Sequence, residues 1–385
     1  MNRDVNLQVD QLCQGLGKIE ARFVRDMITG ISESQSMRLS RIGEALNESI
    51  PLHATHKRLS RNLADHNIAN SLSDRLLELN AKTAKKHTRI VLDQFDIKKK
   101  YATKMQYIDN LDNEQESNVK GYRACEILSS DIEPRTYRPL AQSLWSHNAP
   151  DFEGDHVEVL NLVEKARRAT HGKGILVVNA GLSNNAALLN PWTIDETCRY
   201  IVRLYGNYSL VHKNRTYSAD QLADECETPY GTTIYNYVDS REYQYFIHYG
   251  FVPVRLQAAP ERPLWLVVVK GSGAPYMLLT TEPMRRNRKL LLGIVEAYLT
   301  RWQIVYTNHF SRRQVEFDDL RVLSYERVRN LATLMQATIH SQNSEKGVPI
   351  LEVGLSFERK LHHPPVVPKI EGYPIGPLFS LTGMG

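Results

Sequence analysis

The pattern of the chain changes at Thr88, and the order of elements that follows is the feature that most constrains the fold. Three short runs, "TRIVLDQFDIKKKY", "GYRACEILSS" and "TYRPLAQSLW", have the β-branched and aromatic content of strands. The segment from His156 to Arg168 has apolar residues at helical spacing, and "GILVV" from Gly174 is a further strand. Three strands, a helix and a fourth strand predict a layered α/β core.

The segments on either side of this core have different patterns. Residues 1–88 carry apolar residues at helical spacing and predict a helical N-terminal domain, whereas residues 89–340 are expected to form the core. Within that core, a β-rich insertion is expected at about 199–282. Residues 341–385 are rich in proline and glycine and are interpreted as a C-terminal tail.

Turn residues divide the expected insertion into antiparallel strands. We place the turns at Gly250, Pro260 and Gly271–Gly273. The glycines of "KGSGAPY" could form a phosphate loop, but no strand-to-helix context supports that reading, so a hairpin turn is expected. From Lys289 to His340 the pattern is helical again.

Composition narrows the class of protein. The 385 residues are 42% hydrophobic and 24% charged, as in soluble globular proteins. The longest apolar run, residues 264–269, is too short to cross a bilayer, and the first residues lack an apolar signal region. We therefore expect a cytoplasmic protein without membrane contact. The four cysteines form no CxxC pair, and the net charge of +5 permits an anionic partner.

Two constellations are candidates for chemistry. Asp93 and Asn179 each end an apolar strand, where ligands bind in α/β sheets, although a strand-ending Asp is as often a turn or capping residue. Tyr298, Arg301, Val305 and Arg312 are spaced to share one helix face. In the alternative reading, Val305 belongs to the core and the arginines extend to water.

With these motifs, the sequence resembles the DDE-class insertion-sequence transposases, in the group with a Tyr-Arg-Glu-Lys signature. The match runs from about Ile90 to Ala337 and includes "VLDQFDIKKKYATKM", "IHYGFVPVRL" and "AYLTRWQIVYTNHFSRRQ". The resemblance implies an RNase H-like mixed sheet flanked by helices, with a β-rich insertion and a helical N-terminal domain. Tyr298 and Arg301 match the signature.

The departures from the family fall on its catalytic positions. Asp93 matches the first metal-binding Asp, but Asn179 stands where the family has its second Asp, and Val305 stands where the catalytic Glu belongs. Arg312 takes the place of the Lys. Such enzymes hold two Mg²⁺ ions with three carboxylates, so Asp93 alone is expected to hold neither. The resemblance therefore implies a catalytically inactive protein without a cofactor.

Two alternatives stay open for the chemistry. An active transposase would use Mg²⁺ or Mn²⁺ for DNA cleavage and strand transfer, with other acids replacing the lost ones. The neighbouring candidates for that role are Asp96, Glu316, Asp318 and Asp319. A deliberately inactivated enzyme would explain Asn179, but Val305 is an unusual choice for that purpose.

The partner implied by the resemblance is double-stranded DNA, specifically the inverted repeats at transposon ends. A homodimer is expected because transposases work on paired ends. Basic runs supply candidate phosphate contacts, although each run can equally be a solvated face, and a protein-interaction scaffold is a third class. The candidate DNA-binding residues are Arg38, Arg41, Lys57, Arg58, Arg61, Lys98, Lys99, Lys100, Arg285, Arg286, Arg288, Lys289, Tyr298, Arg301, Arg312 and Arg313.

Overall fold

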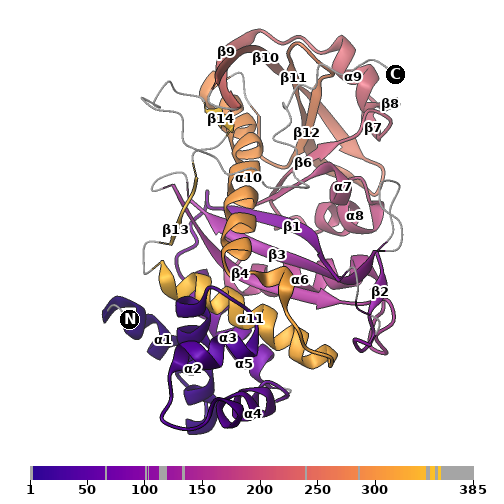
Figure 1. The fold of residues 1–385 in the computed structure, drawn as a ribbon. Helices are drawn as coiled ribbons and strands as arrows, with labels where there is room; N and C mark the ends of the chain where they lie inside the picture. Colours follow the sequence, from indigo (N-terminus) through magenta and orange to yellow (C-terminus); the bar gives the residue numbers. More distant parts are fainter. Residues whose placement is uncertain are drawn as a thin grey trace. The chain divides into compact units, whose positions relative to one another are not determined.

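The structure is a computed structural model that forms two compact units (Figure 1). It describes residues 3–65, 67–99, 102, 104–111, 119–131, 135–238, 241–284, 287–343, 347–351 and 354–356. Unit 1 comprises Met1–Thr88, Asp93–Lys173 and Thr307–Pro349. Unit 2 comprises Arg89–Leu92 and Gly174–Tyr306, with the described residues that follow Pro349.

Unit 1 begins with helices, as predicted for residues 1–88. These are α1 (Arg3–Leu12), α2 (Lys18–Ser34), α3 (Leu39–Leu46), α4 (Leu52–Asn62) and α5 (Ile68–Ala81). Gly30 of α2 lies against α3, where an added Cβ would be 2.5 Å from the Ile42 side chain. Asn330, from a later segment of the chain, forms hydrogen bonds with this helical region. Its Oδ1 accepts from the Ala69 amide at 2.8 Å, and its Nδ2 donates to the carbonyl oxygen of Leu63.

The sheet of unit 1 is formed by strands that the sequence predicted and by two short additions. Its elements are residues 93–98 of β1 (Arg89–Lys98), β2 (Asp109–Asn110), β3 (Lys120–Ser130), β4 (Thr136–Trp145) and β13 (Val348–Pro349). β3 and β4 are antiparallel, and β13 pairs with β4. Helices α5, α6 (Asp155–Ala169) and α11 (Tyr325–Gln342) contact β4. Most of α11 is buried, so it forms the core of this unit.

Unit 2 contains the strand-rich region. Its strands are residues 89–92 of β1, β5 (Ile175–Val178), β6 (Tyr200–Leu204), β7 (Ser209–His212), β8 (Arg215–Ser218), β9 (Tyr230–Val238), β10 (Arg241–Leu256), β11 (Ala259–Lys270), β12 (Tyr276–Thr280) and β14 (Gly354–Ser356). β1, β5 and β6 are parallel, whereas β6, β12, β11 and β10 follow in antiparallel order. Short helices α7 (Ala180–Ser183), α8 (Ala186–Ile194) and α9 (Ala219–Glu225) complete the unit.

The predicted fold class is confirmed, because the chain forms a mixed α/β structure in which helices flank the sheet (Figure 1). The helical signal from Lys289 to His340 corresponds to α10 (Arg288–Gln314), a 3-10 turn η1 (Phe317–Asp319) and α11. α10 contributes its residues up to Tyr306 to unit 2 and those from Thr307 to unit 1.

Two of the three predicted turns are wrong. Gly250 lies inside the long strand β10, paired with Val268. An added Cβ there would lie 1.9 Å from the carbonyl oxygen of Glu227, so glycine is needed for a close backbone approach and not for a turn. Pro260 lies in β11, after the turn at residues 257–258. The hairpin turn at Gly271–Gly273 is confirmed, because β11 and β12 are antiparallel neighbours.

The division into units differs from the predicted domain boundaries. The helices of residues 1–88 share unit 1 with β3, β4 and α11, and the expected core of residues 89–340 is divided between the two units. Of the expected tail, the start of the segment completes α11, and β13 and β14 are described. Residues 357–385 lie outside the described residues. In the described part of the chain, no helix has the length and apolar character that a membrane span requires.

Candidate functional site

Asp93 lies in β1 with only 4% of its surface exposed, and cationic and polar groups of α10 face it. Its Oδ2 is 3.4 Å from His309 Nε2 and 3.9 Å from Arg312 Nη2. His309 and Arg312 are three residues apart in a helix, so they share the face that meets Asp93. All three residues belong to unit 1.

A second acid, Glu126 of β3, completes this cluster. Its side chain is 1% exposed, and its Oε2 lies 3.2 Å from Arg312 Nη1. The amide of Asn308 donates a hydrogen bond to the same oxygen. Glu126 belongs to no motif recognised in the sequence. The signal was available, because the other residues from Ala124 to Leu128 are apolar and an acid in such a buried stretch requires a partner.

The environment of Arg312 differs from both sequence readings, because the side chain is 4% exposed and does not extend to water. The guanidinium carbon lies 3.5 Å from the centre of the Phe95 ring, a cation–π contact. Nη2 lies 2.8 Å from His309 Nδ1 and 2.7 Å from Nε2. A guanidinium can only donate, so the imidazole must accept and is neutral. Burial, followed by the charge of Arg312, lowers the pKa of His309 in agreement with this.

Asn179 and Val305, which the sequence resemblance aligned with catalytic acids, have structural roles in unit 2. Asn179 caps α7, because its Oδ1 accepts from the amide of Leu182 at 3.1 Å. Val305 is 4% exposed and belongs to the apolar core, as the alternative reading of the helix proposed. Tyr298 is 5% exposed, and the Arg301 guanidinium lies 5.5 Å from its ring centre. The signature Tyr and Arg are thus in contact with each other.

These donors do not fit a pair of magnesium ions. Magnesium requires charged oxygen ligands in octahedral geometry, and Val305 has no donor atom. The Asn179 oxygen is neutral and already accepts a backbone hydrogen bond. The carboxylate of Asp93 lies beside a permanent positive charge. Among the residues that the structure describes, no group of three or more His, Cys, Asp or Glu side chains is arranged to hold a metal ion.

The neighbouring acids are engaged elsewhere in unit 1. Asp96 is three residues from Asp93 along β1, which directs the two side chains to opposite faces of the strand. Glu316 accepts from the Ser36 hydroxyl at 3.0 Å, and Asp319 forms an ion pair with Arg38. The side chain of Asp318 is exposed, and its carbonyl oxygen accepts from Lys99. No observation brings these acids to Asp93.

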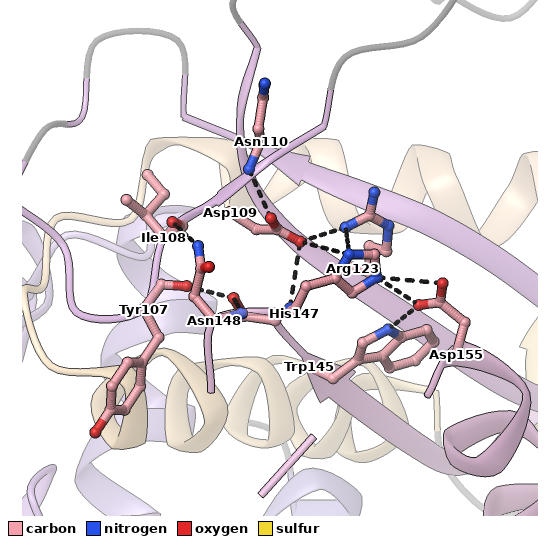
Figure 2. A network of polar contacts seen from close by, with 10 residues as sticks. Tyr107, Ile108, Asp109, Asn110, Arg123, Trp145, His147, Asn148 and Asp155 are labelled. Atoms are coloured by element: carbon pink, nitrogen blue, oxygen red, sulfur yellow. Dashed lines mark hydrogen bonds and ion pairs between the residues drawn. The ribbon is translucent and has the colours of Figure 1, made fainter. Parts of the chain in front are cut away.

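A polar network lies at the ends of β2 and β4 (Figure 2). Asp109 pairs with Arg123 and accepts from the His147 amide at 3.3 Å. Asp155 contacts His147 Nε2 at 3.0 Å and accepts from Trp145 Nε1 at 2.6 Å. Burial acts to raise the pKa of Asp155, but these two hydrogen bonds outweigh it and lower the pKa. Because the acids are already paired, this network joins loops and offers no ligand site.

Helix α4 exposes a basic stripe that contains two of the predicted DNA contacts. His53, His56, Lys57 and Arg61 are exposed and, with the half-buried Ser60, recur at helical spacing on one face. Lys57 and Arg61 form no ion pair with the described residues. The histidines were missed because the prediction relied on runs of Lys and Arg. We call these five residues the α4 stripe.

Arg58 faces away from the α4 stripe and forms ion pairs within unit 1. Its Nη1 lies 2.7 Å from Asp26 and its Nη2 2.9 Å from Glu48, with 23% of the side chain exposed. Lys99 is also buried, and its ammonium donates to the carbonyl oxygens of Asp318 and Leu320. Burial lowers the pKa of Lys99 to about 8. Contacts within the protein hold both side chains, and Arg312 is also buried. The assignment of these three residues as DNA contacts stays a prediction.

The remaining candidates have diverse environments. Arg38 and Arg41 form ion pairs with Asp319 and Glu44, respectively. Arg288 donates to the carbonyl oxygen of Gly231 at 2.9 Å. The exposed candidates elsewhere on the chain are Lys98, Lys289 and Arg313. The predicted contacts Lys100, Arg285 and Arg286 lie outside the described residues.

Comparison with known proteins gives distant structural likeness only. No family model matches the chain, and no curated protein matches its sequence. The structure is similar to that of the piggyBac transposase synaptic complex with hairpin DNA, with a TM-score of 0.42 and 9% identity, over 90% of this chain and 79% of that one. It is also similar to the NurA nuclease from Sulfolobus solfataricus, with a TM-score of 0.29 and 7% identity, over 69% of this chain and 98% of that one. Likeness at this level assigns neither a family nor an activity.

Proposed function

We propose that this protein is a transposase-derived DNA-binding protein that does not catalyse phosphoryl transfer. One observation supports the proposed loss of catalysis, namely the ion pair between Asp93 and Arg312. The only acid that remains at the catalytic positions is neutralised by a side chain of its own chain. A metal ion beside Asp93 would be repelled by that guanidinium, which stays protonated at any physiological pH.

DNA binding is supported by the α4 stripe. α3 and α4 are consecutive helices joined by residues 47–51, and Gly43 of α3 packs on Leu52 and Thr55. In helix-turn-helix proteins, the second helix of such a pair enters the major groove, where basic residues contact phosphates and polar side chains contact base edges. Lys57 and Arg61 would contact phosphates, and Ser60 lies between them on the same face.

The proposed partner is double-stranded DNA, of which the inverted repeats of a transposon end are the specific form. A homodimer would engage two such ends. Such a protein would act in the cytoplasm on the nucleoid. The sequence resemblance through Tyr298 and Arg301 supports descent from a transposase. The exposed basic residues of the α4 stripe support DNA binding.

A salt series of gel shifts on a duplex tests the binding surface. Each lost phosphate contact reduces the magnitude of the slope of log affinity against log salt concentration by about 0.9. In the double variant Lys57→Ala/Arg61→Ala, the magnitude of this slope should therefore fall by nearly two. The matched control is Arg168→Ala/Lys173→Ala, which removes two exposed charges from another part of unit 1. An equal loss in both variants would contradict the assignment to α4. Absence of any shift at low salt would favour a protein-interaction scaffold.

A nicking assay with Mg²⁺ or Mn²⁺ tests the proposed inactivity. The wild-type protein should leave supercoiled DNA intact at every metal concentration. Cleavage that depends on the metal and disappears in Asp93→Ala would show an active transposase with an unusual acid set. Cleavage that survives in Asp93→Ala would indicate a contaminating nuclease, so this variant separates the outcomes.

A further inference from the structure

An open cavity of about 690 Å³ lies in unit 2, where three segments that are far apart in the chain converge. The first is residues 181–190, which include parts of α7 and α8. The second is residues 205–209, between β6 and the start of β7, and the third is residues 256–258, at the turn between β10 and β11. The volume is in the range of small-molecule sites, which is about 300–1,000 Å³. The lining includes neither Asn179 nor any predicted DNA contact.

The lining of this cavity is polar but carries no charge. Its larger polar side chains include Asn185, Asn190, Asn207, Gln257, Tyr205 and Tyr208. Among the described residues that line it, none is Asp, Glu, Lys, Arg or His. A phosphate or a carboxylate held here would have no counter-ion, which is costly for a charged group removed from water. The lining therefore fits a neutral ligand.

The polar groups of the lining are free to bind such a ligand. The side-chain amides of Asn190, Asn207 and Gln257 form no hydrogen bonds with the described residues. Each amide supplies both donors and an acceptor. Tyr205 is 52% exposed, so its ring is accessible. Burial raises the pKa of Tyr208, so its phenol remains protonated and can donate.

We propose that this cavity binds an unpaired nucleobase, either of a free nucleoside or of a single-stranded nucleic acid. A nucleobase is a flat, neutral ring whose edge carries donors and acceptors. Asn and Gln amides pair with such edges, as in the two hydrogen bonds that they form with adenine. Tyrosine rings stack on the face of any base. The site lies in unit 2, so the proposal is independent of the α4 stripe in unit 1.

The walls of the cavity are fixed before a ligand arrives. Asn184 joins two of them, because its Oδ1 accepts from the Tyr205 amide at 2.8 Å and its Nδ2 donates to the carbonyl oxygen of Ala180 at 2.7 Å. The Tyr208 amide donates to the carbonyl oxygen of Tyr205 at 3.1 Å, and the Tyr208 carbonyl oxygen accepts from the Ala219 amide at 2.9 Å. A site that is already ordered loses less entropy on binding.

Isothermal titration calorimetry with adenosine tests the proposal. The wild-type protein should show saturable binding. Tyr205→Ala should weaken it by about tenfold or more, because a stacked base loses its partner. Tyr205→Phe should bind as the wild type does, since the ring remains. Asn190→Ala should weaken binding by about fivefold, through the loss of hydrogen bonds to the base.

Matched controls separate the cavity from the rest of unit 2. Tyr243→Ala removes a tyrosine of β10 that is 43% exposed and does not line the cavity, so it should not change the affinity for adenosine. Adenosine monophosphate should bind no more tightly than adenosine, because no cation of the lining meets its phosphate. Circular dichroism checks that each variant is folded. If Tyr205→Ala is not, Asn190→Ala still tests the site.

A short single strand of deoxyadenosine distinguishes the two sources of the base. The measurement uses the Lys57→Ala/Arg61→Ala background, in which the α4 stripe contributes no phosphate contacts. If Tyr205→Ala weakens binding of this strand as well, the natural ligand is an unpaired base of a nucleic acid. If only adenosine binding responds to Tyr205→Ala, the ligand is a free nucleoside.

Three results would overturn the proposal. One is the absence of saturable binding of both adenosine and the single strand to the wild-type protein. Another is binding that folded Tyr205→Ala and Asn190→Ala leave unchanged. The third is saturable binding of a neutral sugar such as methyl glucoside without binding of adenosine. None of these depends on duplex DNA, so they are distinct from failure of the proposed function.

Discussion

The Nη2 atom of Arg312 lies 3.9 Å from the carboxylate of Asp93, and its Nη1 lies 3.2 Å from Glu126. A positive charge thus lies between two buried acids from different strands of unit 1. The guanidinium supplies charge to both carboxylates without requiring the octahedral ligand set of a magnesium ion.

The capping role of Asn179 predicts a small and specific effect on stability. Asn179→Ala should lower the free energy of unfolding by about 1 kcal/mol, the usual cost of a lost helix cap. Asn179→Asp should retain stability, since a carboxylate also accepts from the Leu182 amide and favours a helix N-terminus. Urea denaturation measures both, with Asn190→Ala as a control outside the cap. An Asp variant as unstable as the Ala variant would argue against the capping role.

Arg58 and Lys57 are neighbours with opposite predicted effects. Arg58→Ala should destabilise the protein by about 2 kcal/mol, because Asp26 and Glu48 lose a partly buried partner. Lys57→Ala should change stability by less than about 0.5 kcal/mol, as expected for an exposed side chain without a partner. Thermal unfolding of the two single variants tests this difference. Equal stability losses would show that the side chain of Arg58 is not anchored in the interior.

The buried side chain of Arg262 should contribute strongly to the stability of unit 2. Its guanidinium donates to five carbonyl oxygens, those of Trp192, Thr193, Asp195, Glu196 and Cys198. Arg262→Met would remove this donor from all five acceptors, of which the Asp195 carbonyl keeps the Cys198 amide at 2.9 Å, and should cost about 3 kcal/mol or more.

Arg262→Lys should rescue little of this loss, because an ammonium has three donors and lacks the planar fork. Arg255→Met, at an exposed position, is the control. Chemical denaturation gives the measurement, and a stable Arg262→Met protein would refute the role.

His340 should make stability depend on pH. Burial, with the charge of Arg138 nearby, lowers the pKa of His340 to about 4, and Nδ1 faces the donating amide of Asn80 at 3.2 Å. In the unfolded chain the pKa is about 6.5. As pH falls from about 6.5 to about 4, only the unfolded chain takes up this proton, so the free energy of unfolding falls by up to about 3 kcal/mol.

The pH dependence can be assigned by comparing variants. His340→Gln should flatten the loss of stability between pH 6.5 and pH 4, whereas His87→Gln, at an exposed position, should leave it unchanged. Urea unfolding at a series of pH values provides the comparison. An unchanged slope in His340→Gln would assign the acid sensitivity to other groups.

The sequence alone predicted the features that depend on residues close together in the chain. The strands β3 and β4, the helix α6 and the hairpin between β11 and β12 follow from periodicity and turn residues. The absence of a carboxylate at Asn179 and at Val305 is likewise a property of the chain itself. The apolar character of Val305 favoured the core, where the structure places it.

Only the tertiary structure decided which charged groups meet. Glu126 and Asn308 are 182 residues apart, and no local pattern joins them. Arg58 and Lys57 are adjacent in a basic run, yet the packing of α4 half-buries Arg58 in ion pairs and exposes Lys57. Local spacing selects helix or strand because backbone conformation depends on near neighbours, whereas an ion pair depends on which distant segments pack together.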